Sequence, residues 1–137
     1  MSIVVDASMA IAWLFADERT DAAHAVMLRV VSDGAVAPSL WRLEVANGLR
    51  NAVRRGRCDE AYVDRSLERL SRFPVEIDEE TSMHAWTSTH TLSREQGLTY
   101  YDAAYLELAA RRSQPLATCD AELIAAAARC GLEVLTA

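Results

Sequence analysis

The chain opens with Ile3-Val4-Val5-Asp6-Ala7-Ser8, a run of three β-branched residues that ends at an aspartate. The apolar run predicts a buried strand, and the Ala-rich stretch after it predicts a helix. Leu116-Ala117-Thr118-Cys119-Asp120 repeats the arrangement near the other end of the chain. Because short buried strands that alternate with helices need crossover connections, we expect an α/β fold with a short parallel sheet flanked by helices.

The rest of the chain continues this alternation. Strands are predicted at 3–5, 35–38, 75–77, 116–118 and 134–135, and helices at 7–15, 20–31, 40–55, 59–72, 81–96, 99–112 and 120–130. Ser39 and Asp59 are expected to cap the third and fourth of these helices, and Gly56 and Gly97 are expected to end the third and the fifth. No linker or repeat interrupts the 137 residues, so we expect a single domain over 1–137.

The charge balance is acidic: 20 Asp and Glu residues stand against 14 basic residues, all of them Arg, for a formal net charge of −6. The lack of Lys excludes a P-loop nucleotide site and a Schiff base. An acidic chain is not a typical nucleic-acid binder, because phosphates need a basic surface, unless several of its carboxylates hold metal cations. The three cysteines lack CxxC spacing, and we see neither a secretory signal nor an apolar run that could span a bilayer. We therefore expect a cytoplasmic protein with reduced thiols and no membrane contact.

Four carboxylates occupy positions that point to a site. Asp6 and Asp120 follow predicted strands, whereas Asp102 and Glu44 each lie about one turn into a predicted helix. Each has a structural explanation as well, since aspartates cap helices and a glutamate on a helix can be solvated. Parallel strands end at one crevice, however, and carboxylates gathered there repel one another unless they are protonated or bind cations. Oxygen ligands without His or Cys suit Mg²⁺ or Mn²⁺.

Four segments, taken together, resemble the PIN domain, and most closely the VapC-type toxins of type II toxin–antitoxin pairs. They are Val4-Val5-Asp6-Ala7-Ser8, Trp41-Arg42-Leu43-Glu44-Val45-Ala46-Asn47, Tyr101-Asp102-Ala103-Ala104-Tyr105-Leu106-Glu107-Leu108-Ala109 and Leu116-Ala117-Thr118-Cys119-Asp120. The resemblance covers essentially the whole chain, in order. It implies a three-layer α/β/α PIN-like fold and an Mg²⁺- or Mn²⁺-dependent ribonuclease that hydrolyses RNA with a metal-activated water.

The resemblance also implies a set of site residues. The family's acidic quartet, which is both catalytic and metal-binding, carries over to Asp6, Glu44, Asp102 and Asp120. The family's auxiliary hydroxyl groups match Ser8 and Thr118. Glu122 stays open between a further acidic contributor and a first-turn residue that the helix dipole favours.

The partners implied are RNA, a cognate VapB-like antitoxin and a second copy of the chain in a homodimer. Arg50, Arg54 and Arg55, with Arg57 beside them, are candidate RNA-binding residues, because Arg matches phosphate oxygens. Cations that stabilise a helix C-terminus are the alternative. Three other functions compete: a PIN-domain nuclease outside toxin–antitoxin biology, a non-catalytic PIN-like RNA-binding module and a haloacid-dehalogenase-type phosphatase. Ser8 stands where that phosphatase family needs a second acidic residue, which disfavours the last.

Overall fold

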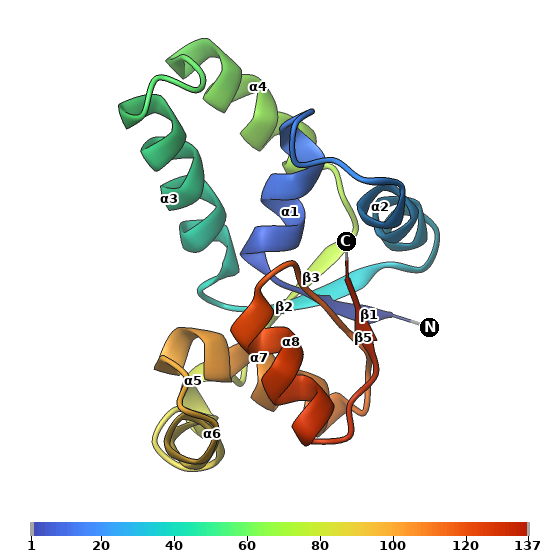
Figure 1. Ribbon diagram of the computed structural model, residues 1–137, viewed down its shortest axis with the longest axis vertical. Coiled ribbons are helices and arrows are strands. Elements are labelled where there is room, and N and C mark those ends of the chain that lie inside the picture. Colours follow the sequence, from blue (N-terminus) through green and yellow to red (C-terminus); the bar gives the residue numbers. More distant parts are fainter. Residues whose placement is uncertain (1, 137) are drawn as a thin grey trace.

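The computed structural model describes residues 2–136, which form a five-stranded parallel sheet in the order β3-β2-β1-β4-β5 (Figure 1). The strands are β1 (Ile3–Val5), β2 (Ala35–Pro38), β3 (Val75–Asp78), β4 (Leu116–Ala117) and β5 (Val134–Leu135). β1 lies at the centre, and all three of its residues are buried. The parallel α/β prediction is therefore confirmed.

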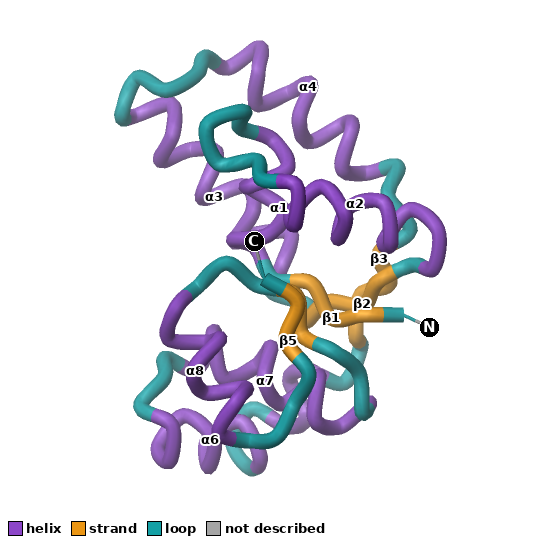
Figure 2. Tube along the Cα trace, turned by 45° about the vertical axis from the view of Figure 1, so that its right-hand side comes forward, coloured by secondary structure: helices purple, strands orange, loops and turns teal. Residues whose placement is uncertain are grey.

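Helices lie on both sides of the sheet and make a three-layer α/β/α arrangement (Figures 1 and 2). One side holds α1 (Ala7–Leu14), α2 (Asp21–Asp33), α3 (Trp41–Arg54) and α4 (Glu60–Ser71). The other side holds α5 (Thr81–His84), α6 (Ser88–Gln96), α7 (Tyr100–Arg112) and α8 (Ala121–Arg129). Among the helices of residues 2–136, none is long and apolar enough to cross a membrane.

The core forms where the sheet meets α1 and α7. Trp13 and Leu14 on α1, with Phe15 after it, are buried. On the other face, α7 contacts β1, β2 and β4, and every one of its residues from 103 to 109 is buried. Burial along two full turns holds this helix firmly against the sheet. The first turn of α7, which precedes this buried stretch, is therefore fixed in position relative to the sheet.

Most helix ends lie within a residue or two of the sequence prediction, and capping explains why. Asp59 accepts a hydrogen bond from the backbone N–H of Tyr62 at the start of α4, as predicted. Gly97 adopts a left-handed conformation, with φ of 65°, and ends α6. Glycine reaches that conformation without the steric cost that a Cβ brings.

Two predictions about helices are wrong. The helix predicted at 81–96 is broken into α5 and α6, because the backbone of Thr87 leaves the helical region, with ψ of −97°. α5 has no buried residue, whereas α6 packs along α7, so tertiary contacts support the second piece and not one long helix. Ser39 also fails as a cap. Its backbone N–H instead donates to Thr81 Oγ1, and α3 begins after Leu40 without a side-chain cap.

Candidate active site

Asp6 lies at the carboxyl end of the central strand β1, beside the end of β4. Its carboxylate accepts hydrogen bonds from the Thr118 hydroxyl at 2.5 Å, from the Ser8 hydroxyl at 2.8 and 2.9 Å, and from the backbone N–H of Met9 at 2.9 Å. The side chain is 4% exposed. Asp6 thus caps α1 and at the same time places a buried carboxylate at the carboxyl ends of the parallel strands. The Ser8 and Thr118 hydroxyl groups both donate hydrogen bonds to this one carboxylate.

Asp120 follows β4 and caps α8, where its Oδ1 accepts from the backbone N–H of Leu123 at 3.0 Å. Asp102 lies in the first turn of α7, and its backbone N–H donates to Thr99 Oγ1 at 3.1 Å. Carboxylate oxygens of Asp102, Asp120 and Glu122 all lie within 4.8 Å of one another. The start of α7 and the start of α8, which follows β4, therefore bring three acidic side chains together.

Glu44 reaches the same region from α3. Its Oε1 accepts a hydrogen bond from the Tyr105 hydroxyl group on α7 at 2.6 Å. The helix face that carries Glu44 also includes Gly48, where an added Cβ would lie 3.2 Å from Ile11 Cδ1. The small residue on this face thus allows α1 to approach α3 closely. Asp6 and Glu44 are not part of the group of oxygens within 4.8 Å, and hydrogen bonds to the Thr118 and Tyr105 hydroxyl groups hold their carboxylates next to it.

The carboxylates interact electrostatically. Burial, with a smaller effect from the Asp120 charge, raises the pKa of Asp6 from 3.8 to about 6, although its three hydrogen-bond donors act against the rise. Burial raises the pKa of Asp102 as well, and the charges of Asp120, Glu44 and Glu122 add to that effect. Burial and the Glu44 carboxylate raise the pKa of Tyr105, so its hydroxyl group stays protonated. Ionised carboxylates are thus destabilised here by partial burial and mutual repulsion.

These residues fit a hard divalent cation. The donor set consists of carboxylate oxygens alone, which Mg²⁺ and Mn²⁺ accept and which lacks the His or Cys ligands typical of zinc. A cation would also relieve the repulsion that raises the pKa of Asp102. Asp102, Asp120 and Glu122 have the spacing to hold the ion, with Asp6 and Glu44 beside them.

Two residues of this region, Glu122 and Tyr105, make contacts in the structure that the sequence did not predict. The sequence leaves two roles open for Glu122, and in the structure its carboxylate joins those of Asp102 and Asp120. Its place two residues after Asp120 was the available signal, since both residues lie at the start of one helix. Tyr105 was not singled out for any role. Its spacing of three residues from Asp102 on a helix placed both side chains on one face, but nothing in the sequence indicated that Glu44 would meet it.

The family model of the PIN domain matches residues 3–129. The chain belongs to the PIN-domain family. Ribonuclease VapC3 of Pyrobaculum aerophilum is 33% identical to it over 125 residues, which are 90% of this chain and 92% of that protein. Ribonuclease VapC3 of Mycobacterium tuberculosis is 34% identical over 123 residues, 88% of this chain and 84% of that protein. The resemblance drawn from the four sequence segments is therefore confirmed.

Two solved structures share the fold of this chain. PAE2754 from Pyrobaculum aerophilum superposes with a TM-score of 0.67 at 29% identity, covering 92% of this chain and 84% of that one. FitAcB from Neisseria gonorrhoeae superposes with a TM-score of 0.66 at 15% identity, covering 97% of this chain and 96% of that one. The second match is a likeness of fold alone.

The candidate RNA-binding arginines of the PIN domain lie at the end of α3 and just beyond it. Arg50 contacts Glu60, and Arg57 pairs with acidic residues at 17 and 18 while it lies 4.2 Å from the centre of the Phe15 ring. Arg54 and Arg55 are exposed, and within residues 2–136 neither forms an ion pair. Of the group, these two have guanidinium groups available for phosphate.

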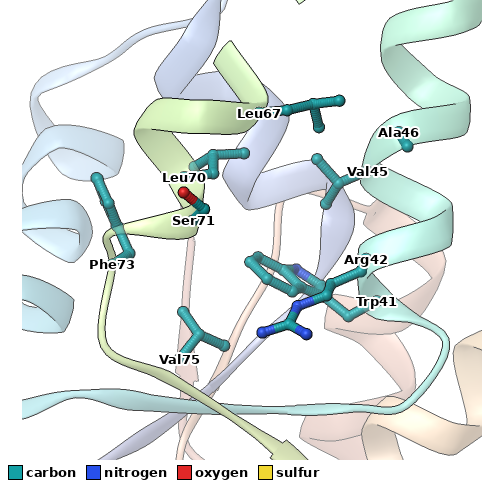
Figure 3. A pocket seen from close by; sticks show the side chains of 9 residues that line it. All are labelled: Trp41, Arg42, Val45, Ala46, Leu67, Leu70, Ser71, Phe73 and Val75. Atoms are coloured by element: carbon teal, nitrogen blue, oxygen red, sulfur yellow. The ribbon is translucent and has the colours of Figure 1, made fainter. Parts of the chain in front are cut away.

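A separate apolar pocket of about 260 Å³ lies between α3 and α4 (Figure 3). Its lining includes Trp41, Val45, Leu67, Leu70 and Phe73. Trp41 is 4% exposed, and its indole N–H has no hydrogen-bond partner within residues 2–136. A buried donor without a partner is costly. The lining of the pocket is mainly apolar, so it can accept an apolar group.

Proposed function

We propose that this PIN domain is an endoribonuclease toxin of the VapC type that hydrolyses RNA with the help of Mg²⁺ or Mn²⁺. One observation carries the proposal: the oxygens of Asp102, Asp120 and Glu122 lie within 4.8 Å of one another at the sheet edge where Asp6 is buried. Relatives at 33% and 34% identity named Ribonuclease VapC3 support the reaction class. On this proposal residues 1–137 act as one domain in the cytoplasm.

The part of the protein in the reaction is to bind a divalent cation through its acidic side chains and to fix the position of that cation. Asp102, Asp120 and Glu122 would hold the divalent cation, and Asp6 and Glu44 would complete the negative environment around it. A bound cation supplies Lewis acidity there: it lowers the pKa of water and offsets negative charge on phosphate oxygens. Because no side chain in the site is a suitable nucleophile, we expect hydrolysis by water, which leaves a 5′-phosphate and a 3′-hydroxyl on the RNA.

Ser8 and Thr118 support Asp6 through the two hydroxyl hydrogen bonds. The same hydroxyl oxygens accept from the backbone N–H groups of Cys119 and Asp120. Each hydroxyl proton is therefore directed toward the carboxylate. The network holds Asp6 at the sheet edge without adding a positive charge that would compete with a cation.

Expression in a bacterial host tests the toxin proposal. We expect induction of the wild type to stop growth and to leave cleaved RNA, and Asp102→Asn to remove both effects at equal protein level. Asp64→Asn, which changes an exposed carboxylate on α4, should behave as the wild type does. Growth arrest and RNA cleavage by Asp102→Asn would contradict the proposal.

An antitoxin is the partner that we propose for the apolar pocket. An apolar side chain of the antitoxin would fill the space between α3 and α4. The test is co-purification with the product of an adjacent antitoxin gene. Leu67→Glu should weaken that complex, because Leu67 lines the pocket and is 38% exposed. Binding unchanged by Leu67→Glu would place the antitoxin elsewhere.

The homodimer implied by the family resemblance remains a proposal as well. Sedimentation of the purified chain without antitoxin tests it. A mass of twice the 15.1 kDa of the chain would support the dimer, and a mass equal to it at micromolar concentration would contradict it.

A further inference from the structure

Tyr105 is a buried side chain whose hydroxyl group lies among the carboxylates of the site. The residue is 1% exposed and lies on α7, three residues after Asp102. Residues at this spacing share one face of a helix. Its hydroxyl group donates to Glu44 Oε1 at 2.6 Å, which joins two residues 61 positions apart in the sequence.

Glu44 differs from the other acidic residues in how it is held. Asp6 and Asp120 are short side chains that cap α1 and α8, so backbone N–H groups of their own helices hold them. Glu44 has a longer side chain and lies on α3, which packs mainly on α1 and α4. Within residues 2–136, the Tyr105 hydroxyl is the one group that donates a hydrogen bond to Glu44. Without it, the Glu44 side chain would gain rotamer freedom and turn toward water.

We propose that Tyr105 is a positioning residue for the cation site: its hydroxyl group binds one oxygen of Glu44 and leaves the other oxygen available to a divalent cation. The inference rests on the proposed function. A phenol serves this purpose better than Arg would, because it orients the carboxylate without bringing a positive charge into the site. Partners that orient metal ligands typically change metal affinity by about 10- to 100-fold when they are removed.

A purely structural role is the competing explanation, since the same hydrogen bond links α3 to α7. The two explanations differ in what they predict for metal binding. A structural link would change the stability of the fold and leave the affinity of the site for a cation unaltered. A positioning residue would change that affinity, and would do so only while Glu44 is present.

The test is Mn²⁺ binding to the purified protein, measured by electron paramagnetic resonance of free Mn²⁺. Tyr105→Phe keeps the buried ring and removes the hydroxyl group, and we expect about 10-fold weaker binding. Tyr62→Phe is the matched control, because the Tyr62 hydroxyl donates to the Leu14 carbonyl away from the site. In a Glu44→Gln background, Tyr105→Phe should weaken binding less than about 2-fold, since its effect passes through the Glu44 carboxylate.

The outcomes separate this inference from the proposed function. Wild-type affinity in Tyr105→Phe would overturn the inference and leave the proposed function standing. An equal loss with and without the Glu44 carboxylate would also overturn it, because Tyr105 would then act by another route. A wild type that binds no Mn²⁺ would overturn both.

Discussion

Burial destabilises the ionised form of the Asp6 carboxylate. Its carboxylate is 4% exposed, and burial raises its pKa from 3.8 to about 6 despite three hydrogen-bond donors. A raised pKa means that the folded protein binds the proton more tightly than the unfolded chain does. The stabilisation by protonated Asp6 is therefore complete below pH 3.8, and it is lost as the pH rises through 6.

The pH dependence of the free energy of unfolding tests this effect of burial on Asp6 in the metal-free protein. Asp6→Asn keeps a capping oxygen and removes the charge, so we expect it to be more stable than the wild type by about 3 kcal/mol at pH 7. Because most of the wild type's Asp6 is protonated at pH 4.5, the difference should fall to about 1 kcal/mol there. Urea unfolding in EDTA at both pH values measures it. A difference independent of pH would contradict the assigned pKa shift.

At the scale of elements, α7 connects the site to the rest of the fold. Its first turn carries Asp102, and its last turns carry Glu107 and Arg111. Arg111 binds the Glu107 carboxylate at 2.8 and 3.0 Å and that of Asp78, at the end of β3, at 2.7 and 3.1 Å. Burial alone would raise the pKa of Asp78, but hydrogen bonds from Arg111 and Thr81 outweigh it and lower the pKa to about 2.

Removal of Arg111 should destabilise the fold strongly. Arg111→Met leaves Glu107 at 4% and Asp78 at 1% exposure without their main cation, and a broken buried ion pair costs about 3–5 kcal/mol. Arg112→Met is the control, since Arg112 lies farther from its carboxylate partners, at 3.4 and 3.6 Å. Urea unfolding at pH 7 compares them. A loss in Arg111→Met no larger than that in Arg112→Met would show that the pair does not support α7.

Elements with local signals could be predicted from the sequence. The apolar runs at 3–5 and 35–38, the Asp59 cap and the Gly97 stop each depend on neighbouring residues, and each prediction is confirmed. The break at Thr87 could not be predicted, because no Pro or Gly marks it in the sequence. Long-range contacts such as Tyr105 with Glu44 depend on how α3 and α7 are placed, and sequence spacing carries no such information.

At the scale of the whole molecule, a net charge of −6 would repel RNA. The charges, however, are unevenly distributed over the protein. Acidic side chains gather at the proposed cation site, whereas Arg54 and Arg55 are exposed near the end of α3. RNA would meet the protein through local positive charge and a cation. The overall acidity is then no obstacle to the proposed reaction.

The salt dependence of RNA binding tests this division of charge. In an Asp102→Asn background that prevents cleavage, Arg54→Ala with Arg55→Ala should lower the slope of log affinity against log salt by about 1.4, for two lost phosphate contacts on a single strand. Arg65→Ala with Arg72→Ala removes the same charge from α4 and from the residue that follows it, and should leave the slope unchanged. An equal change in both double variants would mean that net charge, and not this position, attracts RNA.

The most direct test of the central claim is cleavage of total RNA by purified protein with and without Mn²⁺, comparing the wild type with Asp120→Asn. Asn at 120 retains an oxygen that can cap α8, so the fold should persist. We predict cleavage by the wild type that needs Mn²⁺, 5′-phosphate ends on the fragments, and loss of at least 100-fold in rate in Asp120→Asn, on the order expected when a group that stabilises transition-state charge is removed. Cleavage by the wild type in EDTA, or near-normal cleavage by folded Asp120→Asn, would contradict the account.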